Sequence, residues 1–148
     1  MENEFYQSAV QTNSLGTTFG TLLLRDALIP ELVGTDNNIL YWMGKSLARK
    51  FKVANLDNLS AFYLDANFGK LEQVKVKKDE QTFELSGPIV KKRQELGRAE
   101  FLLEAGFLAQ TIQQQVGFIT EAIIAKTNKN GVTLLVKIDL KDPINDKE

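Results

Sequence analysis

The chain has 148 residues, of which 43% are hydrophobic and 25% are charged, and its formal net charge is −1 at pH 7. These values are typical of one globular domain that buries roughly 70% of the surface of its unfolded chain. They exclude wholesale disorder. The near-zero net charge argues against nucleic-acid binding, because phosphate contacts require clustered Lys and Arg side chains. The absence of cysteine excludes disulfides, thiol nucleophiles and thiolate metal sites.

The chain also contains no histidine. Histidine is the usual general base near neutral pH and the commonest ligand of transition metals and haem. Without His and Cys the chain cannot form a Ser-His-Asp triad, a Cys-His dyad, the usual zinc sites or a His- or Cys-ligated haem. We therefore predict no catalytic residues, no metal site and no cofactor. Chemistry that uses carboxylates alone stays open as the least favoured alternative.

The first ten residues, MENEFYQSAV, are acidic and lack the apolar segment of a signal peptide. No uncharged apolar run approaches the ~20 residues of a membrane span. We expect a cytoplasmic protein with a polar N-terminal arm over residues 1–17, one domain over residues 18–143 and a C-terminal tail over residues 144–148.

Three helices are predicted in the first half of the chain. The first covers residues 18–33, and Pro30 is expected to bend or break it because proline removes an intrahelical hydrogen bond. The second lies in ILYWMGKSLARKF and has the clearest helical spacing of apolar residues. The third begins with Asp57 as its N-cap and ends before Gly69.

The periodicity then changes to that of strands and one long helix. The predicted strands cover residues 71–76, 83–85, 119–127 and 132–140, and the helix covers residues 99–116. Gly87-Pro88 ends the first strand pair, and KKRQELGR is predicted to be a linker or the first turn of a helix. The turn Asn128–Gly131 joins the second strand pair. The long helix is apolar almost all round at its start, which is typical of a buried helix or an interface.

The segments ILYWMGKSLARKF and FLLEAGFLAQTIQQQ, followed by the final strand pair, are similar to the 4-vinyl reductase domain pattern. That pattern has an aromatic-Gly-x-x-Leu-Ala helix and a later Gly-Phe-Leu-Ala helix. The segments GPI, LEAGFLA and KDP resemble more closely the YslB-like proteins, a family of unknown function in Gram-positive bacteria. The resemblance covers residues 18–143.

This resemblance implies the superfamily of the haem-nitric-oxide-binding domain and the vesicle-tethering TRAPP subunits. We therefore expect an α+β fold of order ααα-ββ-α-ββ, with an antiparallel four-stranded sheet packed against a helical bundle. Dimers or a buried apolar cavity are common in such folds. Relatives hold haem through histidine, and metal or covalent lipid through cysteine; this chain has neither residue, so none of the three is carried over.

Several residues have both a binding and a structural interpretation. The aromatic cluster at Trp42–Gly44 could line an apolar pocket or belong to the core. Gly44 and Gly106 lie inside helices, where glycine costs ~1 kcal/mol relative to alanine, which favours close helix packing over room for a ligand. Glu104 could anchor the polar head of a ligand, or lie at a rim and pair with a basic residue such as Arg98. The basic run Lys91–Arg93 is expected to be solvated.

The leading hypothesis is a non-catalytic module that binds a small apolar or amphiphilic molecule, such as an acyl chain. Its pocket would lie between the helices around residues 42–47 and 103–112. The predicted lining residues are Trp42, Met43, Gly44, Leu47, Leu103, Glu104, Phe107 and Leu108. One alternative is a homodimeric scaffold that uses its apolar helix as the dimer interface. Another is an enzyme that uses Glu104 with a second carboxylate.

Overall fold

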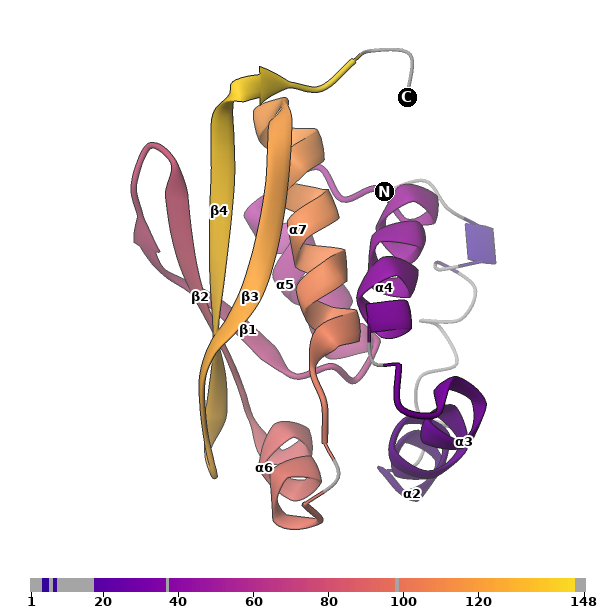
Figure 1. The fold of residues 1–148 in the computed structure, drawn as a ribbon. Coiled ribbons are helices and arrows are strands. Elements are labelled where there is room, and N and C mark those ends of the chain that lie inside the picture. The colour runs from indigo at the N-terminus through magenta and orange to yellow at the C-terminus, as the bar shows by residue number, and fades with distance from the viewer. Residues whose placement is uncertain (1–3, 6, 8–17, 37, 98, 146–148) are drawn as a thin grey trace.

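The computed structural model describes residues 4, 5, 7, 18–36, 38–97 and 99–145 (Figure 1). Most of the predicted N-terminal arm and the end of the predicted tail therefore lie outside the described residues. The helices are α2 (Thr18–Leu22), η2 (Leu23–Leu28), α3 (Ile29–Val33), α4 (Asn38–Lys50), α5 (Leu56–Asp65), α6 (Pro88–Glu95) and α7 (Leu102–Val116). The strands are β1 (Lys70–Val76), β2 (Glu80–Ser86), β3 (Phe118–Asn128) and β4 (Gly131–Pro143).

The four strands form one antiparallel sheet of order β1-β2-β4-β3. Two hairpins, β1–β2 and β3–β4, meet where β2 pairs with β4. The turn of the second hairpin is held by Asn128, whose side-chain oxygen accepts hydrogen bonds from the N–H groups of Asn130 and Gly131. Asparagine favours such turns because its side chain can hydrogen-bond to backbone groups a few residues further along the chain. The predicted hairpin turn is confirmed.

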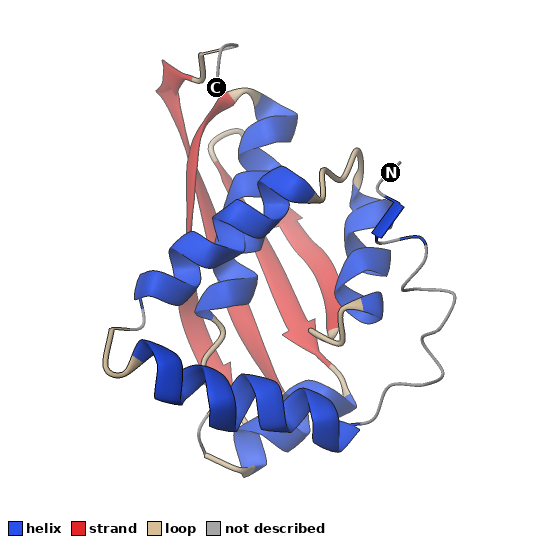
Figure 2. Ribbon diagram, turned by 90° about the vertical axis from the view of Figure 1, so that its right-hand side faces the viewer, coloured by secondary structure: helices blue, strands red, loops and turns tan. Residues whose placement is uncertain are grey.

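The described helices lie on one side of this sheet, and none of them covers the opposite face (Figures 1 and 2). Helix α7 packs on the sheet and α4 packs on the outer side of α7. Side chains along β4 alternate between buried and more exposed positions, which is the pattern of a sheet with one covered face. The core lies between the sheet and α7, with Phe83, Leu85, Leu108, Leu134 and Val136 fully buried. The α+β fold expected from the resemblance is confirmed.

Helix α4 is also fixed to the edge strand β3. The hydroxyl of Tyr41 donates a hydrogen bond to the carboxylate of Glu121 and accepts one from the N–H of Ala122. The ammonium group of Lys45 contacts the same carboxylate at 2.8 Å. The tyrosine therefore satisfies a backbone donor of an edge strand, a group that would otherwise be open to pairing with another chain.

A bend or break was expected at Pro30 in the first helical segment. Instead, the helix is wider over the turns before Pro30 and continues past it. Leu23–Leu28 form a π-helix, and the N–H of Ile29 donates to the carbonyl oxygen of Leu24, five residues earlier. Pro30 has no N–H to donate, so the turn before it closes with a wider ring and the helix continues into α3. The segment ends at Gly34, which has a φ of +62°.

Two further expectations differ from the structure. Residues 91–95 of the segment predicted as a linker or first turn belong to the helix α6. This helix begins after Gly87 at Pro88, a residue suited to the first helical position because its missing N–H has no partner there. Helix α5 is capped by Asn55, whose side chain accepts the N–H of Asn58, and Asp57 lies inside the first turn. Asparagine two residues earlier competes successfully for the N-cap because its side-chain oxygen reaches the same free donors.

Candidate functional site: a buried charge cluster between two grooves

Five charged residues meet in the interior where the N-terminal segment, α6 and the start of α7 come together. We call Arg25, Asp26, Arg93, Glu100 and Glu104 the charge cluster. Arg93 is 2% exposed and Glu104 is 0% exposed. Charged side chains are rarely buried to this extent unless they are paired, so the cluster is the most unusual feature of the described interior.

Arg93 lies at the centre of the cluster. Its Nε and Nη2 atoms donate to both carboxylate oxygens of Asp26, over distances of 2.9 to 3.2 Å. Its Nη1 donates to Glu104 at 3.0 Å, and its Nη2 donates to the backbone oxygen of Glu100 at 2.8 Å. The guanidinium lies 4.6 Å from the centre of the Phe101 ring, at cation–π distance. This planar fork geometry is available to arginine and not to lysine.

Arg25 reaches the same carboxylates from the N-terminal segment. It donates to the two oxygens of Glu104 at 2.8 and 3.2 Å and to Glu100 at 3.0 Å. Burial lowers the pKa of Arg25, but the carboxylates of Glu104 and Glu100 outweigh burial and raise the pKa above its ordinary value. The Nε–H of Arg25 has no hydrogen-bond acceptor among the described residues.

Two further hydrogen bonds involve backbone groups near the cluster. The hydroxyl of Tyr63 donates to the carbonyl oxygen of Glu104 at 2.7 Å, and burial together with the Glu104 carboxylate raises the pKa of Tyr63 well above its usual value. Glu100 accepts the N–H of Leu102 at the start of α7. The cluster holds three carboxylates and two guanidinium groups, and the positive end of the α7 dipole stabilises the excess negative charge.

The arrangement leaves little scope for carboxylate chemistry. Each of the six carboxylate oxygens of the cluster accepts at least one hydrogen bond. A general base or a nucleophile requires an oxygen that faces a substrate, whereas these oxygens face arginines and backbone. Within the described residues, no group of three or more Asp or Glu side chains could hold a metal ion. The geometry therefore supports a role in holding three elements together.

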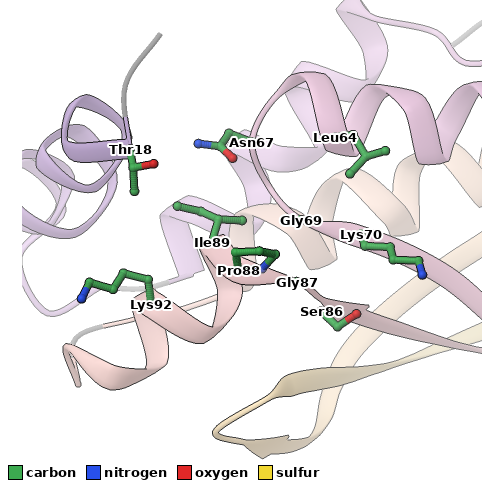
Figure 3. Close-up of a pocket in the computed structure, with 10 residues that line it drawn as sticks. All are labelled: Thr18, Leu64, Asn67, Gly69, Lys70, Ser86, Gly87, Pro88, Ile89 and Lys92. Atoms are coloured by element: carbon green, nitrogen blue, oxygen red, sulfur yellow. The ribbon is translucent and has the colours of Figure 1, made fainter.

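Two grooves border the N-terminal segment, and Asp26 of the cluster lines one of them. The first, which we call the α5–α6 groove, has a volume of about 450 Å3 (Figure 3). Its lining residues are Thr18, Leu64, Asn67, Gly69, Lys70, Ser86, Gly87, Pro88, Ile89 and Lys92. The second, which we call the η2–α6 groove, has a volume of about 430 Å3 and is lined by Phe19, Leu22, Leu23, Asp26, Ala27, Lys92 and Leu96. Both volumes fall within the usual range for small-molecule sites.

The eight residues predicted to line a pocket lie elsewhere, on α4 and α7. Only some of them form the contact between these helices. Gly44 and Gly106 face the backbone of the opposite helix: a Cβ atom would lie 2.1 Å from the carbonyl oxygen of Leu103 at one glycine and 2.0 Å from that of Tyr41 at the other. The preferred interpretation of these glycines as sites of close packing is confirmed.

The other predicted pocket residues divide into two groups. Trp42 and Met43 point outward and are 58% and 48% exposed, and Leu47 is half-buried. Leu103, Glu104, Phe107 and Leu108 are buried on α7. None of the eight lines either groove. That they bind a ligand stays a prediction, and it would require α4 and α7 to separate.

Sequence reasoning found one member of the charge cluster and missed the rest. Glu104 is buried, so its interpretation as a rim residue is wrong, and its partners are Arg25 and Arg93; Arg98 lies outside the described residues. Arg93 is buried although it belongs to a basic run that was expected to be solvated. A usable signal was the adjacent pair Arg25-Asp26 inside an otherwise apolar helical run.

No helix in the described part of the chain is both long enough and apolar enough to span a membrane.

Comparison with known structures places the fold. A vinyl-4-reductase family protein from Methanocaldococcus jannaschii superimposes with a TM-score of 0.65 at 16% identity, covering 89% of this chain and 91% of that one. The phenol-responsive sensory domain of the transcription activator PoxR, solved with phenol, superimposes with a TM-score of 0.56 at 14% identity. That match covers 83% of this chain and 75% of the PoxR chain.

The sequence matches are more specific than the structural ones. The chain is 40% identical over 125 residues to the uncharacterized protein YslB of Bacillus subtilis (strain 168), a match that covers 82% of this chain and 84% of YslB. The family described as protein of unknown function (DUF2507) matches residues 18–137. The chain therefore belongs to the DUF2507 family and has the fold of a vinyl-4-reductase family protein.

Proposed function

We propose that this protein binds a small apolar or amphiphilic molecule without transforming it, and that the molecule lies in the α5–α6 groove. The observation that carries this proposal is a groove of about 450 Å3 lined by residues of α2, α5, β1, β2 and α6, in a fold shared with a phenol-responsive sensory domain. Ligand sites of this size are commonly largely preformed and mostly apolar, with a few polar groups that orient the ligand.

The lining of the groove fits an amphiphile. Leu64, Pro88 and Ile89 provide an apolar wall, and Figure 3 shows Leu64 and Ile89 entering it from α5 and α6. Asn67 and Ser86 add polar groups. Burial of an apolar ligand would contribute roughly 25 cal/mol per Å2 before the entropy cost of binding, which is enough for useful affinity without chemistry.

The proposal is tested with the fluorescent apolar probe N-phenyl-1-naphthylamine. We expect saturable binding to the wild-type chain and an increase of about tenfold or more in Kd for Leu64→Glu, because the new carboxylate must be desolvated next to the probe. The matched control is Leu56→Glu at the other end of α5, outside the groove, which should leave Kd unchanged. The proposal is wrong if the wild-type chain does not bind the probe or if both variants weaken it equally.

Native mass spectrometry of the freshly purified protein, followed by solvent extraction, would identify a natural ligand. A stoichiometric mass that is lost on extraction would give the ligand its chemical class.

We propose homodimerisation as a second function, because one surface of the helical layer exposes many large apolar side chains. Leu24, Leu28 and Leu32 recur every four residues along the N-terminal segment, with exposed fractions of 47% to 75%. Trp42 and Met43 are exposed on α4. We propose that these side chains together form one apolar surface, because a contiguous surface of this kind commonly marks an interface.

A further inference from the structure

The N-terminal segment, Thr18–Val33, is attached to the rest of the molecule in a different way from the other helices. The structure describes all of its residues, and Asp26 is the only one of them that is buried. Its apolar side chains are partly buried or exposed; the large exposed ones are Phe19, Leu23, Leu24, Leu28 and Leu32. Helix α7, in contrast, buries ten of its residues. Apolar burial therefore contributes much less to holding this segment than to holding α7.

Charged contacts join the segment to the body instead. Asp26 binds Arg93 of α6 at 2.9 Å, and Arg25 binds Glu104 of α7 at 2.8 Å. Such pairs require defined geometry on both sides, and losing one partner leaves an uncompensated buried charge. Among the described residues the buried Nε–H of Arg25 finds no acceptor, and a buried donor left unsatisfied in the closed arrangement favours opening.

The segment that these charged contacts hold in place also contributes lining residues to both grooves. Thr18 forms part of the α5–α6 groove, and five residues from Phe19 to Ala27 form one wall of the η2–α6 groove. Lys92 of α6 lines both grooves. Figure 2 shows the segment lying across the end of the helical layer. Movement of the segment away from α6 would therefore open the two grooves into one.

We propose that Thr18–Val33 is a lid that opens as a unit, that the charge cluster is the latch that holds it closed, and that opening joins the two grooves into one entry for ligand. The opening itself requires no ligand. Only the control of ligand entry rests on the proposed binding function.

Hydrogen exchange measured by mass spectrometry on the full chain tests the latch. In the wild-type protein, amides of the lid should exchange through an opening that leaves α7 protected. Asp26→Asn keeps the side-chain shape but replaces one carboxylate oxygen that accepts from Arg93 with an NH2 group, which cannot accept. Lid exchange should therefore become at least about tenfold faster while α7 exchange is unchanged. The matched control, Glu95→Gln, removes an exposed ion pair from the same helix α6 and should change neither. Equal acceleration in α7, or no acceleration in the lid, overturns the proposal.

A disulfide lock tests ligand entry and does not depend on disrupting the cluster. The side chains of Thr21 in the lid and Asn67 in the body are hydrogen-bonded at 3.0 Å, and the chain has no other cysteine to compete with a pair placed there. In the variant Thr21→Cys/Asn67→Cys, the oxidised form should associate with N-phenyl-1-naphthylamine at least about tenfold more slowly than the reduced form of the same variant. Because both forms carry the same change at the groove residue Asn67, the difference reports the lock alone.

The possible results separate the two proposals. Association that is equally fast in the locked and reduced forms overturns the lid as a gate. If the wild-type chain takes up no probe, the binding function fails, and hydrogen exchange still decides whether the segment opens as a lid.

Discussion

Glu104 illustrates how far a single residue can be interpreted from sequence. An acid inside FLLEAGFLA is unusual enough to be singled out, and it is indeed fully buried in the charge cluster. Its partners could not be predicted, because Arg25 lies 79 residues away and Arg93 belongs to a run whose composition is that of a solvated surface. Whether one arginine of such a run is buried depends on tertiary contacts that local composition does not encode.

Tyr63 is a single residue that should make the free energy of unfolding depend on pH. Burial raises the pKa of its phenol well above the unfolded value of ~10, so the unfolded chain loses the proton first as the pH rises. The stabilising contribution is complete below the unfolded pKa and is lost above it. Between pH 9 and 11 we expect a loss of about 1.4 kcal/mol of unfolding free energy from this group.

Urea denaturation of the wild-type chain and of Tyr63→Phe at the two pH values isolates that contribution. The variant should lose less stability over this interval, and other alkaline titrations, such as those of lysine, should affect both proteins equally. If the wild-type chain and Tyr63→Phe lose the same unfolding free energy between the two pH values, the Tyr63 phenol does not titrate differently in the folded and unfolded states.

At the scale of secondary-structure elements, the most specific feature is the close contact between α4 and α7. Glycines at two mid-helix positions predicted close packing, and each of them faces a backbone carbonyl of the other helix. Helix propensity alone would make Gly106→Ala stabilising by ~1 kcal/mol. The added Cβ would lie 2.0 Å from the carbonyl oxygen of Tyr41, which forces the helices apart. We therefore expect destabilisation of about 1–3 kcal/mol or more.

The sign of the change in unfolding free energy shows whether helix propensity or the close contact between the helices dominates at Gly106. Denaturant unfolding measures this change. Gln114→Gly and Gln114→Ala provide the propensity difference on the same helix at a partly exposed position. There, alanine should be the more stable residue by ~1 kcal/mol. Stabilisation by Gly106→Ala would mean that the two helices are not in close contact in solution.

Elements with strong periodicity were predictable, and those defined by their neighbours were not. The helix α4 and the final hairpin follow from apolar spacing and turn residues. Helix α6 was underestimated because Pro88–Glu95 contains few apolar residues, and its burial depends on Arg93 pairing with a distant segment. The π-helix before Pro30 has no sequence pattern of its own; only the missing N–H of proline indicates an irregularity there.

At the scale of the whole molecule, the fold was predictable and the candidate site was not. The order of elements and the family resemblance indicated the α+β architecture, and an apolar helix indicated where the core would lie. The grooves, however, form between segments that are far apart in sequence, such as Thr18, Leu64 and Ile89. A pocket of this kind depends on how packed elements meet, so residue spacing along one helix could not locate it.

The exposed apolar side chains of the helical layer are the basis of the proposed homodimer. The N-terminal segment and α4 both lie on the outer surface of this layer (Figure 2). A stable dimer buries about 800 Å2 per subunit, and an apolar face is the usual core of such an interface. We expect light scattering at micromolar concentration to give twice the monomer mass of 16.6 kDa.

Leu32→Glu should convert that dimer to a monomer, because Leu32 is 75% exposed and a carboxylate there would be buried without a partner. Val76→Glu is the matched control, since Val76 is 61% exposed on β1, in the sheet layer. It should leave the dimer intact. A wild-type monomer would contradict homodimerisation. A dimer that persists in Leu32→Glu would instead place the interface on a different surface, such as the open face of the sheet.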